Sequence, residues 1–344
     1  MNRIILWMII LACVATPVLG QIDTDQTITK TGTSAAQFLK IGVDARATAM
    51  GGAFVAMEGD LSAMFWNPAG LGHFTGLGVM FVHSNWLADI NFNHIALATD
   101  LGNVGIIGLS ITNLAVPDDI VRTVEQPNGT GELFNSSDLA ANLTFARRLT
   151  DKFSIGGSVK YIQQRIWHES ASAFAADIGA LFTTPFNGIR IGASITNFGG
   201  NMRLNGRDLR FSKDPDDFNE GNVQFVNAMY ETDEFPLPLN FRVGIAGELY
   251  QNKNMRVTFG LDAIHPKDNT ESVNAGAEFA FSELFFLRAG YATLFRQDTE
   301  EGLTFGGGIH YRVWGSSTIL KIDYAYADFG LLDYVQRFSI GINF

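Results

Sequence analysis

The chain has 344 residues and a formal net charge of -11; charged residues make up 17% of it and hydrophobic residues 47%. Such an acidic chain lacks the basic surface that nucleic-acid phosphates and anionic lipids require, so its composition excludes nucleic-acid binding and disfavours a polybasic membrane contact. The 28 Phe and 36 Gly indicate much apolar sequence cut into short pieces by glycine.

The first twenty residues have the features of a secretory signal. One arginine precedes an apolar run over 4–14, and we predict a signal peptide over 1–20 that is cleaved between Gly20 and Gln21. A membrane anchor is the alternative, but the run is too short for about 30 Å of hydrocarbon. Lipoprotein processing at Cys13 would leave a very short leader. Because Cys13 is the only cysteine, the mature chain would have no disulfide and no cysteine-bound metal.

The next segment, residues 21–75, does not alternate as strands do. Asp60 is placed to cap a short helical turn over 61–66, and Asn67-Pro68 would end that turn. A compact segment rich in Ala, Gly and Met fits inside a wide barrel, so we predict a plug in the lumen or at its periplasmic end.

From residue 76 to residue 344 apolar and polar residues alternate, as they do on strands with one apolar face. Val257, Phe259 and Leu261, for example, alternate with Thr258 and Gly260. Most runs are longer than strands of globular sheets and match the roughly ten-residue spans of outer-membrane barrels, whose strand number is even. Fourteen strands are predicted, near 76–87, 90–101, 104–116, 138–149, 153–166, 171–184, 189–199, 238–250, 255–266, 271–282, 285–295, 302–314, 317–330 and 333–344.

The predicted connections differ by parity. Every even-numbered connection is short, and the two long ones, 117–137 and 200–237, are both odd. Short periplasmic turns and long outer loops are typical of outer-membrane barrels. We therefore predict an all-β, transmembrane antiparallel barrel in the outer membrane of a Gram-negative bacterium, in contact with outer-membrane lipid and lipopolysaccharide.

The last predicted strand is amphipathic and ends on an aromatic residue. Phe338 and Phe344 lie on its apolar side, and Gly341 lies on the other. This pattern resembles the signal that the outer-membrane barrel assembly machinery reads, so we assign Phe338, Gly341 and Phe344 to it and expect that machinery as a partner.

Charged residues of both signs fall on the predicted inner face. On the lipid face each Lys or Arg would cost about 2–4 kcal/mol at mid-membrane. Two interpretations stay open: ion pairs that hold a plug to the wall, with Asp44 and Arg46 as plug contacts, or a path that guides a solute. The inward-facing set is Lys160, Asp177, Arg242, Glu248, Arg256, Asp262, Glu278, Arg288, Arg312, Lys321 and Asp323.

No pattern of catalytic or metal-binding residues is present. The six histidines are scattered without ligand spacing, and no nucleophile can be paired with a base. Asp214, Asp216, Asp217 and Glu220 could bind a divalent cation, but their spacing fails the EF-hand pattern and favours a solvated acidic loop. We predict no cofactor and no enzymatic activity; a lipid hydrolase built in a barrel is the disfavoured alternative.

Two stretches carry a resemblance to a known family. Residues 42–54, Gly-Val-Asp-Ala-Arg-Ala-Thr-Ala-Met-Gly-Gly-Ala-Phe, and residues 66–71, Trp-Asn-Pro-Ala-Gly-Leu, are similar to the N-terminal signature of the PorV/PorQ family. More remotely they resemble FadL, the outer-membrane fatty-acid transporter, whose hatch also ends in Asn-Pro-Ala. The resemblance implies a FadL-like barrel with an N-terminal hatch. Its motif residues would be Asp44, Arg46, Trp66, Asn67 and Pro68.

The resemblance also implies a role in type IX protein secretion, as a partner of the translocon barrel and of secreted cargo. The outer loops would supply the binding surface, with Phe225, Tyr230 and Phe235 as apolar anchors among acids such as Asp233 and Glu234. The alternative is a FadL-like transporter of hydrophobic small molecules. That alternative predicts a pocket lined by Phe and Leu beside the hatch, and a gap in the wall.

Overall fold

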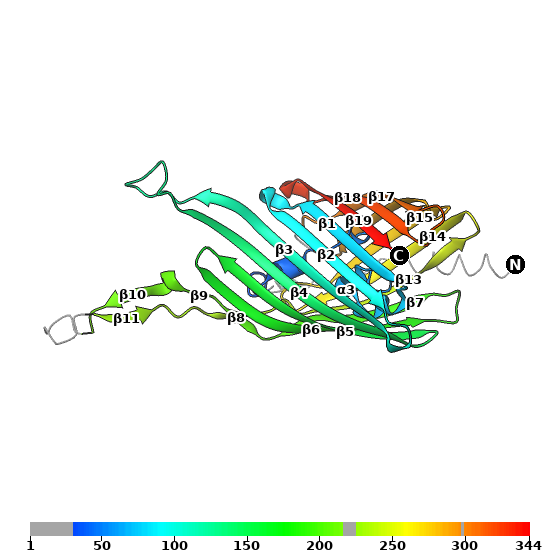
Figure 1. Cartoon of the computed structure of the whole chain (residues 1–344), viewed down its shortest axis with the longest axis horizontal. Coiled ribbons are helices and arrows are strands. Elements are labelled where there is room, and N and C mark those ends of the chain that lie inside the picture. Colours follow the sequence, from blue (N-terminus) through cyan, green and yellow to red (C-terminus); the bar gives the residue numbers. More distant parts are fainter. Residues whose placement is uncertain (1–29, 216–224, 297–298) are drawn as a thin grey trace, which may run out of the picture.

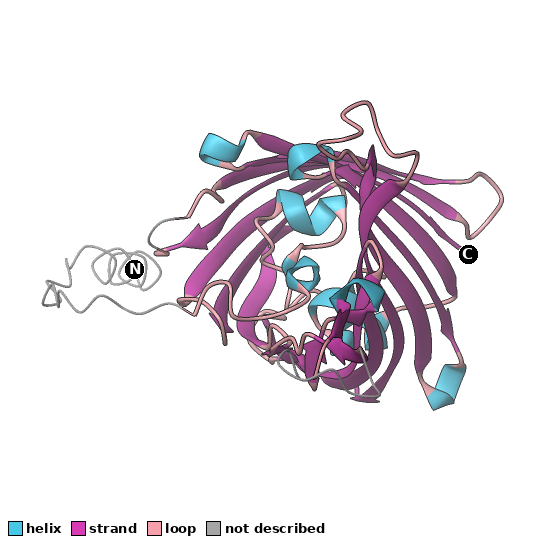
Figure 2. Ribbon diagram, turned by 90° about the vertical axis from the view of Figure 1, so that its left-hand side faces the viewer, coloured by secondary structure: helices cyan, strands magenta, loops and turns pink. Residues whose placement is uncertain are grey.

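Fourteen antiparallel strands form a closed ring around a short helical segment (Figures 1 and 2). The structure, a computed structural model, describes residues 30–215, 225–296 and 299–344. No helix among these residues is long and apolar enough to cross a membrane. The strands of the ring are β1 (Leu77–Asn85), β2 (Asn91–Asp100), β3 (Ile106–Ile120), β4 (Leu133–Thr150), β5 (Phe153–Ile166), β6 (Glu169–Thr183), β7 (Arg190–Gly199), β13 (Asn240–Gln251), β14 (Met255–Pro266), β15 (Ser272–Phe281), β16 (Phe285–Leu294), β17 (Leu303–Arg312), β18 (Ile319–Asp328) and β19 (Tyr334–Asn343).

The ring closes between its first and last strands. β1 pairs with β19 from Gly78 opposite Asn343 to Asn85 opposite Gln336, and every other strand pairs with a neighbour on each side. Closure leaves no open sheet edge, which a hydrocarbon environment requires because unpaired backbone groups have no water there. The predicted fourteen-strand barrel is confirmed, and the short even-numbered turns are confirmed with it.

The outer face of the ring is apolar. In β1 the side chains of Leu77, Val79 and Phe81 are exposed, while those of Met80 and Val82 are buried in the interior. The same alternation runs through the other strands, so large apolar side chains cover the outside of the wall. This is the surface that a barrel presents to lipid, and it is why the period-two pattern of the sequence is so regular.

Two predicted loops contain more strand than expected. β3 and β4 continue to Ile120 and from Leu133, beyond a bulge between Val116 and Asp119. In this extension the apolar alternation disappears, because both faces of the hairpin are exposed and no lipid or core selects one of them. Figure 1 shows the hairpin projecting past the neighbouring strands.

The second long connection, between β7 and β13, forms an arm with its own short strands. We call residues 200–215 and 225–239 the outer arm, which extends from the barrel in Figure 1. Two antiparallel pairs build it, β8 with β12 and β10 with β11. Its elements are β8 (Asn201–Arg203), β9 (Asn205–Gly206), the 3-10 helix η5 (Arg207–Leu209), β10 (Arg210–Lys213), β11 (Val226–Met229) and β12 (Glu234–Pro236).

The segment before β1 lies inside the ring, as Figure 2 shows. Asp60 accepts hydrogen bonds from the backbone N–H and the hydroxyl of Ser62, and the helical turn that follows ends before Asn67. The chain then continues in a 3-10 helix that starts at Pro68, where proline lacks only a donor that the first turn does not use. The helices of this segment are η1 (Gln37–Lys40), α2 (Ala45–Ala49), α3 (Ala63–Trp66) and η2 (Pro68–His73); η3 (Leu87–Asp89), η4 (Gly102–Val104) and η6 (Gly330–Leu332) lie in turns of the barrel.

Candidate functional site

The Trp66-Asn67-Pro68 sequence joins the plug segment to the barrel wall. The Asn67 side chain donates to the carbonyl of Val55 within the plug at 2.7 Å and to that of Ala180 in β6 at 3.1 Å. Its amide oxygen accepts from the N–H of Ala69 and starts η2. Both N–H donors and the oxygen of this buried amide therefore have a partner.

Glycines of the wall allow the plug to approach this closely. A Cβ atom at Gly179 in β6 would overlap the amide oxygen of Asn67, and one at Gly156 in β5 would overlap the carbonyl of Pro68. These contacts give a physical reason for part of the high glycine content: the inner face of the wall must be flat where plug backbone lies against it.

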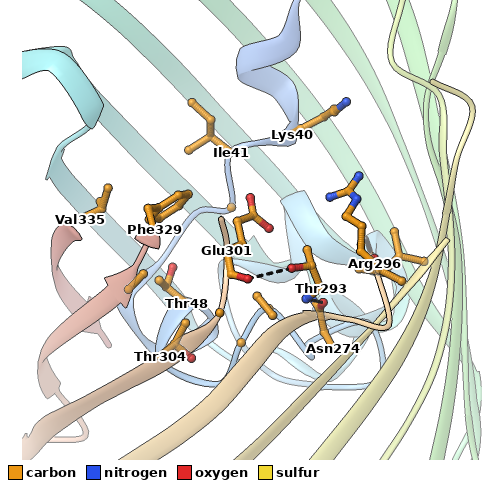
Figure 3. Close-up of a pocket in the computed structure, with 18 of the residues that line it drawn as sticks. Lys40, Ile41, Thr48, Asn274, Thr293, Arg296, Glu301, Thr304, Phe329 and Val335 are labelled. Carbon is orange, nitrogen blue, oxygen red and sulfur yellow. Dashed lines mark hydrogen bonds between the residues drawn. The ribbon is translucent and has the colours of Figure 1, made fainter. Parts of the chain in front are cut away.

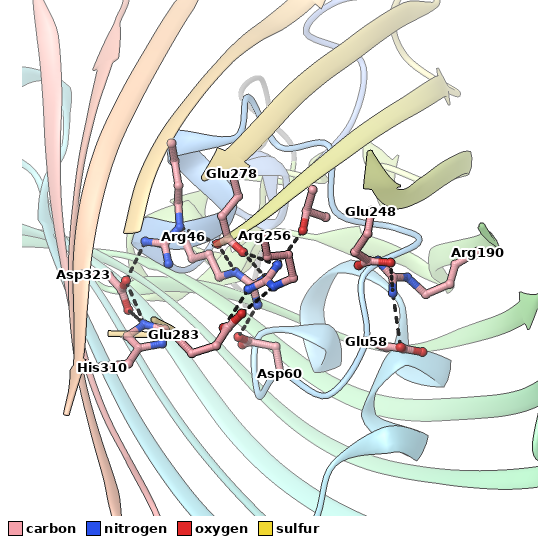
Figure 4. Close-up of polar contacts among 12 residues, drawn as sticks. Arg46, Glu58, Asp60, Arg190, Glu248, Arg256, Glu278, Glu283, His310 and Asp323 are labelled. Atoms are coloured by element: carbon pink, nitrogen blue, oxygen red, sulfur yellow. Dashed lines mark hydrogen bonds and ion pairs between the residues drawn. The ribbon is translucent and has the colours of Figure 1, made fainter. Parts of the chain in front are cut away.

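Ion pairs fill the half of the lumen nearer the short turns, which we call the periplasmic half after the predicted orientation (Figure 4). Arg46 of α2 forms a two-pronged pair with Glu278 of β15, with distances of 2.8 and 3.0 Å, and also reaches Asp60 at 3.3 Å. Glu278 is fully buried and additionally pairs with Arg256 at 3.1 Å and Arg288 at 2.7 Å. One buried carboxylate thus ties the plug to β14, β15 and β16, and the two-pronged geometry fixes the orientation of Arg46.

The network continues on both sides of Glu278. Arg288 donates to Asp323 of β18 at 2.6 Å, and Asp323 also contacts His310 of β17. Farther round the wall, Arg190 bridges Glu248 at 2.8 Å and Glu58 of the plug at 3.3 Å. Each of these arginines has a carboxylate partner, which is what a buried guanidinium needs to offset its desolvation.

Asp44, the other charged residue of the motif, has a different environment from Arg46. It is buried at the start of α2, and no cation among the described residues lies within ion-pair distance of its carboxyl. Burial, together with the nearby carboxylates of Asp60 and Asp323, raises the pKa of Asp44 to about 7. For Asp60 burial alone would raise the pKa, but Lys321 and Arg46 hold it below its usual value. The plug therefore holds two buried carboxyl groups whose pKa values are shifted in opposite directions.

The outer half of the lumen contains a cavity of about 250 Å³ above the plug (Figure 3). Its floor is plug backbone near Gly42 and Gly52 together with Trp66, and its walls come from the outer ends of β13 to β19. Three arginines line it: Arg242, Arg296 and Arg337. The exposed residues Glu301 and Asp328 lie at its edge, so the cavity opens toward the long loops.

The cavity is not the pocket lined by Phe and Leu that the FadL-like alternative predicts. Phe329 is the only phenylalanine among its described lining residues, and no leucine lines it; its apolar lining comes from residues such as Trp66, Trp86 and Ile264, beside threonine, asparagine, glycine and arginine. The wall beside it is continuous in hydrogen-bonded pairs around the whole ring. Two features are expected of a FadL-like transporter, a pocket lined by Phe and Leu beside the hatch and a gap in the wall, and neither is present in the described residues.

The outer arm is attached to the wall at its base and carries exposed aromatic side chains. His168 pairs with Asp208 at 2.7 Å, and the N–H of Asp208 donates to Glu169 of β6. Phe225, Tyr230 and Phe235 are exposed as the sequence predicts. Their surroundings are acidic and basic residues such as Arg203, which pairs with Glu231 and Glu234.

The remaining predicted residues lie outside this site or outside the described chain. Phe338 is exposed on the lipid side of β19 and Phe344 follows it, with its N–H bound to the carbonyl of Leu77; Gly341 is opposite Met80. Gly20, Gln21 and three of the four acids of the predicted cation loop lie outside the described residues. No group of three or more His, Cys, Asp or Glu side chains in the described chain is arranged to hold a metal ion.

Sequence reasoning missed two of the three cavity arginines. Arg337 lies on the inner face of β19, where the alternation with Phe338 would have placed it. Arg296 lies in the connection between β16 and β17, which gave no periodic signal. Nothing in the sequence indicates that these residues converge with Arg242, because the three are far apart along the chain.

Comparisons with known proteins support the fold and the family. A family model described as type IX secretion system protein PorV matches residues 23–264. No curated protein matches the chain.

Several solved barrels are similar in structure. The Ralstonia pickettii toluene transporter TbuX has 14% identity and a TM-score of 0.52, with 88% of this chain and 97% of that chain covered. The Pseudomonas putida toluene transporter TodX has 14% identity and a TM-score of 0.51, with 88% and 96% covered. A FadL homologue of Pseudomonas aeruginosa has 10% identity and a TM-score of 0.50, with 88% and 98% covered. Likeness at this identity shows that the chain has the FadL-like fold.

Proposed function

Because the chain belongs to the PorV family of type IX secretion system proteins, we propose that it serves protein secretion as a binding partner at the cell surface and not as an open pore. In this role it would hold the translocon barrel, secreted cargo or both through its outer loops. The observation that carries the proposal is the outer arm, which presents exposed aromatic side chains on a hairpin tied to the wall.

The shape of the arm suits protein binding. The ring centroids of Phe211 and Tyr230 lie 4.6 Å apart at the β10–β11 pair, with planes tilted by 30°, so each ring restricts the motion of the other. Rigid aromatic anchors surrounded by charged residues such as Arg203 and Glu234 are the composition that protein interfaces favour. Preorganised anchors lose little side-chain entropy on binding.

The filled lumen supports a role without conduction. Plug backbone lies directly against wall glycines, and buried ion pairs join it to several strands. Transport of hydrophobic small molecules is the alternative role, and the similar structures include toluene transporters. The lack of a pocket lined by Phe and Leu, and the strand pairing that runs round the whole wall, favour the binding role among the described residues.

The test is secretion in a strain that lacks the chromosomal copy. We expect the triple variant Phe225→Ser, Tyr230→Ser, Phe235→Ser to reach the outer membrane at the normal level and to lose cargo secretion. Leu331→Ser is the control, because Leu331 is an even more exposed apolar residue in another outer loop. Normal secretion in the deletion strain, or in the triple variant, would contradict the proposal.

We also propose that the last strand is the part that the barrel assembly machinery reads, with Phe338 and Phe344 as the apolar contacts. Both side chains face outward, where a partner can reach them before insertion into lipid. Cleavage between Gly20 and Gln21, and the boundary between plug and barrel at 75–76, remain predictions that N-terminal sequencing and limited proteolysis can check.

A further inference from the structure

The three arginines of the outer cavity have no carboxylate partner. Among the described residues, no Asp or Glu lies within ion-pair distance of Arg242, Arg296 or Arg337. The Nε atom of each is buried without a hydrogen-bond partner. Arg242 and Arg337 are only 7% and 2% exposed, so water does not replace a counter-ion for them as it would at the surface.

Nearby carboxylates are already engaged. Asp262 accepts hydrogen bonds from the backbone N–H groups of Phe54 and Val55. Asp177 pairs with Lys160 at 2.7 Å. The cavity also receives Lys40, whose ammonium group is paired with Asp268. Glu301 is the exception: it lines the cavity and attracts Arg242 and Arg296 electrostatically, but it forms no ion pair with them, so their guanidinium groups still face the cavity.

Aromatic rings stabilise two of the arginines only in part. Arg242 lies over Trp66 at 4.7 Å, and Arg337 lies between Phe92 at 5.5 Å and Trp86 at 6.0 Å. A ring face attracts the positive charge but accepts no N–H hydrogen bond in the guanidinium plane. Arg337 donates to the hydroxyl of Thr48, and no other hydrogen bond of its side chain is formed with a described residue. The guanidinium groups of Arg242 and Arg337 therefore have N–H donors left to bind a ligand in the cavity.

We propose that the outer cavity is a binding site for a compact oxyanion, a carboxylate or a phosphate. Arg242 and Arg337 would donate hydrogen bonds to it from the edges of their guanidinium groups. Arg296 at the cavity mouth would add a third positive charge. Guanidinium groups match planar carboxylates and phosphates in pairs of hydrogen bonds. A volume of about 250 Å³ is below that of sites for drug-sized molecules and limits the ligand to a small one.

The mouth of the cavity restricts what can enter. Asp328 and Glu301 line it, and their negative charges would repel a highly charged polyanion more strongly than a small monoanion or monoester. The plug and its ion pairs close the other side. The ligand would thus arrive from the cell exterior, either free in the medium or as the phosphate of a lipid headgroup. This inference does not depend on the proposed role in secretion.

Titration of the purified full barrel in detergent tests the proposal. The probes are inorganic phosphate and benzoate, at constant ionic strength set with sodium chloride. Two of the mature chain's tryptophans, Trp66 and Trp86, stack on the cavity arginines, so we expect saturable changes in tryptophan fluorescence together with a higher apparent melting temperature. Short-chain phosphatidic acid is the third probe. If it competes with phosphate, the ligand is the phosphate of a lipid headgroup; if it does not compete, the ligand is a free anion.

The variants separate binding from folding. Arg242→Gln and Arg296→Gln should each weaken binding of the probes at least tenfold, while Arg312→Gln, the same charge change at an exposed inner-face position distant from the cavity, should leave it unchanged. Arg296→Gln keeps the test valid if Arg242→Gln misfolds, because Arg296 lies in a loop. Responses that do not saturate, equal responses to chloride, or equal affinity in all three variants would overturn the proposal.

Discussion

Buried arginines have different partners in the two halves of the lumen. In the periplasmic half Arg46, Arg190, Arg256 and Arg288 each meet a carboxylate, with Glu278 shared by three of them. In the outer half the cavity arginines meet aromatic rings and open space. Pairing indicates a structural role, because it offsets the cost of burying the charge. The cavity arginines have no such partner and keep the free-energy cost of burying their charge. This indicates a site where a bound ligand supplies the missing negative charge.

Removing the shared carboxylate should have the largest effect. Glu278→Gln removes the negative charge that Arg46, Arg256 and Arg288 share. We expect a loss of about 3–5 kcal/mol in the free energy of unfolding. Apparent melting temperature in detergent, followed by circular dichroism or by heat-dependent gel mobility, measures it. Glu283→Gln is the control: it pairs with Arg256 at an exposed site and should cost less than about 1 kcal/mol. Equal losses of stability in both variants would contradict the claim that the buried carboxylate of Glu278 stabilises the barrel more than the exposed carboxylate of Glu283.

Filling the space between plug and wall should have the next largest effect. Gly179→Ala places a methyl group in the position of the Asn67 amide, and we expect a loss of about 1–3 kcal/mol from overpacking. Gly157→Ala in β5 is the matched control, because no atom lies closer than 3.6 Å to a Cβ at that position. The same melting experiment compares the two. If Gly179→Ala melts like Gly157→Ala, the plug does not pack against β6 as described.

The smallest expected effect is a dependence on pH that Asp44 creates. In the folded barrel its pKa is about 7, raised by burial and by Asp60 and Asp323, while in the unfolded chain it is near 3.8. Between these values the folded state binds the extra proton, so this group's contribution favours folding below pH 4 and is lost as the pH rises to about 7. Arg288 opposes the shift without cancelling it.

Asp44→Asn removes that contribution. We expect the difference in melting temperature between the variant and the wild type to grow in favour of the variant from pH 4.5 to pH 7.5. The comparison of two proteins cancels the other titrating groups. Parallel curves over this range would show that Asp44 does not hold its proton in the folded barrel.

Much of the barrel could be predicted from sequence because lipid enforces the pattern. One face of each strand must be apolar, so period-two alternation persists for about ten residues and gives both strand number and position. The β3–β4 extension could not be predicted, because neither of its faces must be apolar. Both faces are exposed, so its sequence does not alternate. The short strands of the outer arm escaped for the same reason.

The candidate site could be predicted only as a set of inward-facing charges. Arg242 and Arg288 occupy equivalent positions in the alternation, yet one lines a cavity and the other is buried in a network. The difference depends on partners such as Arg46 and Glu278, which are 232 residues apart in the chain. Sequence spacing holds no record of such contacts, so the two interpretations of the inner charges, ion pairs or a path for a solute, could not be separated without the structure.

A direct comparison of one arginine from each half tests the central claim. Arg288→Met and Arg242→Met remove the same charge and leave a side chain of similar length in the wall. Without added oxyanion, the account predicts that Arg288→Met loses about 3–5 kcal/mol of stability, because Glu278 and Asp323 lose a buried partner, while Arg242→Met stays within about 1 kcal/mol of the wild type or exceeds it. Equal destabilisation of the two variants would contradict the division of the lumen into a structural half and a binding half.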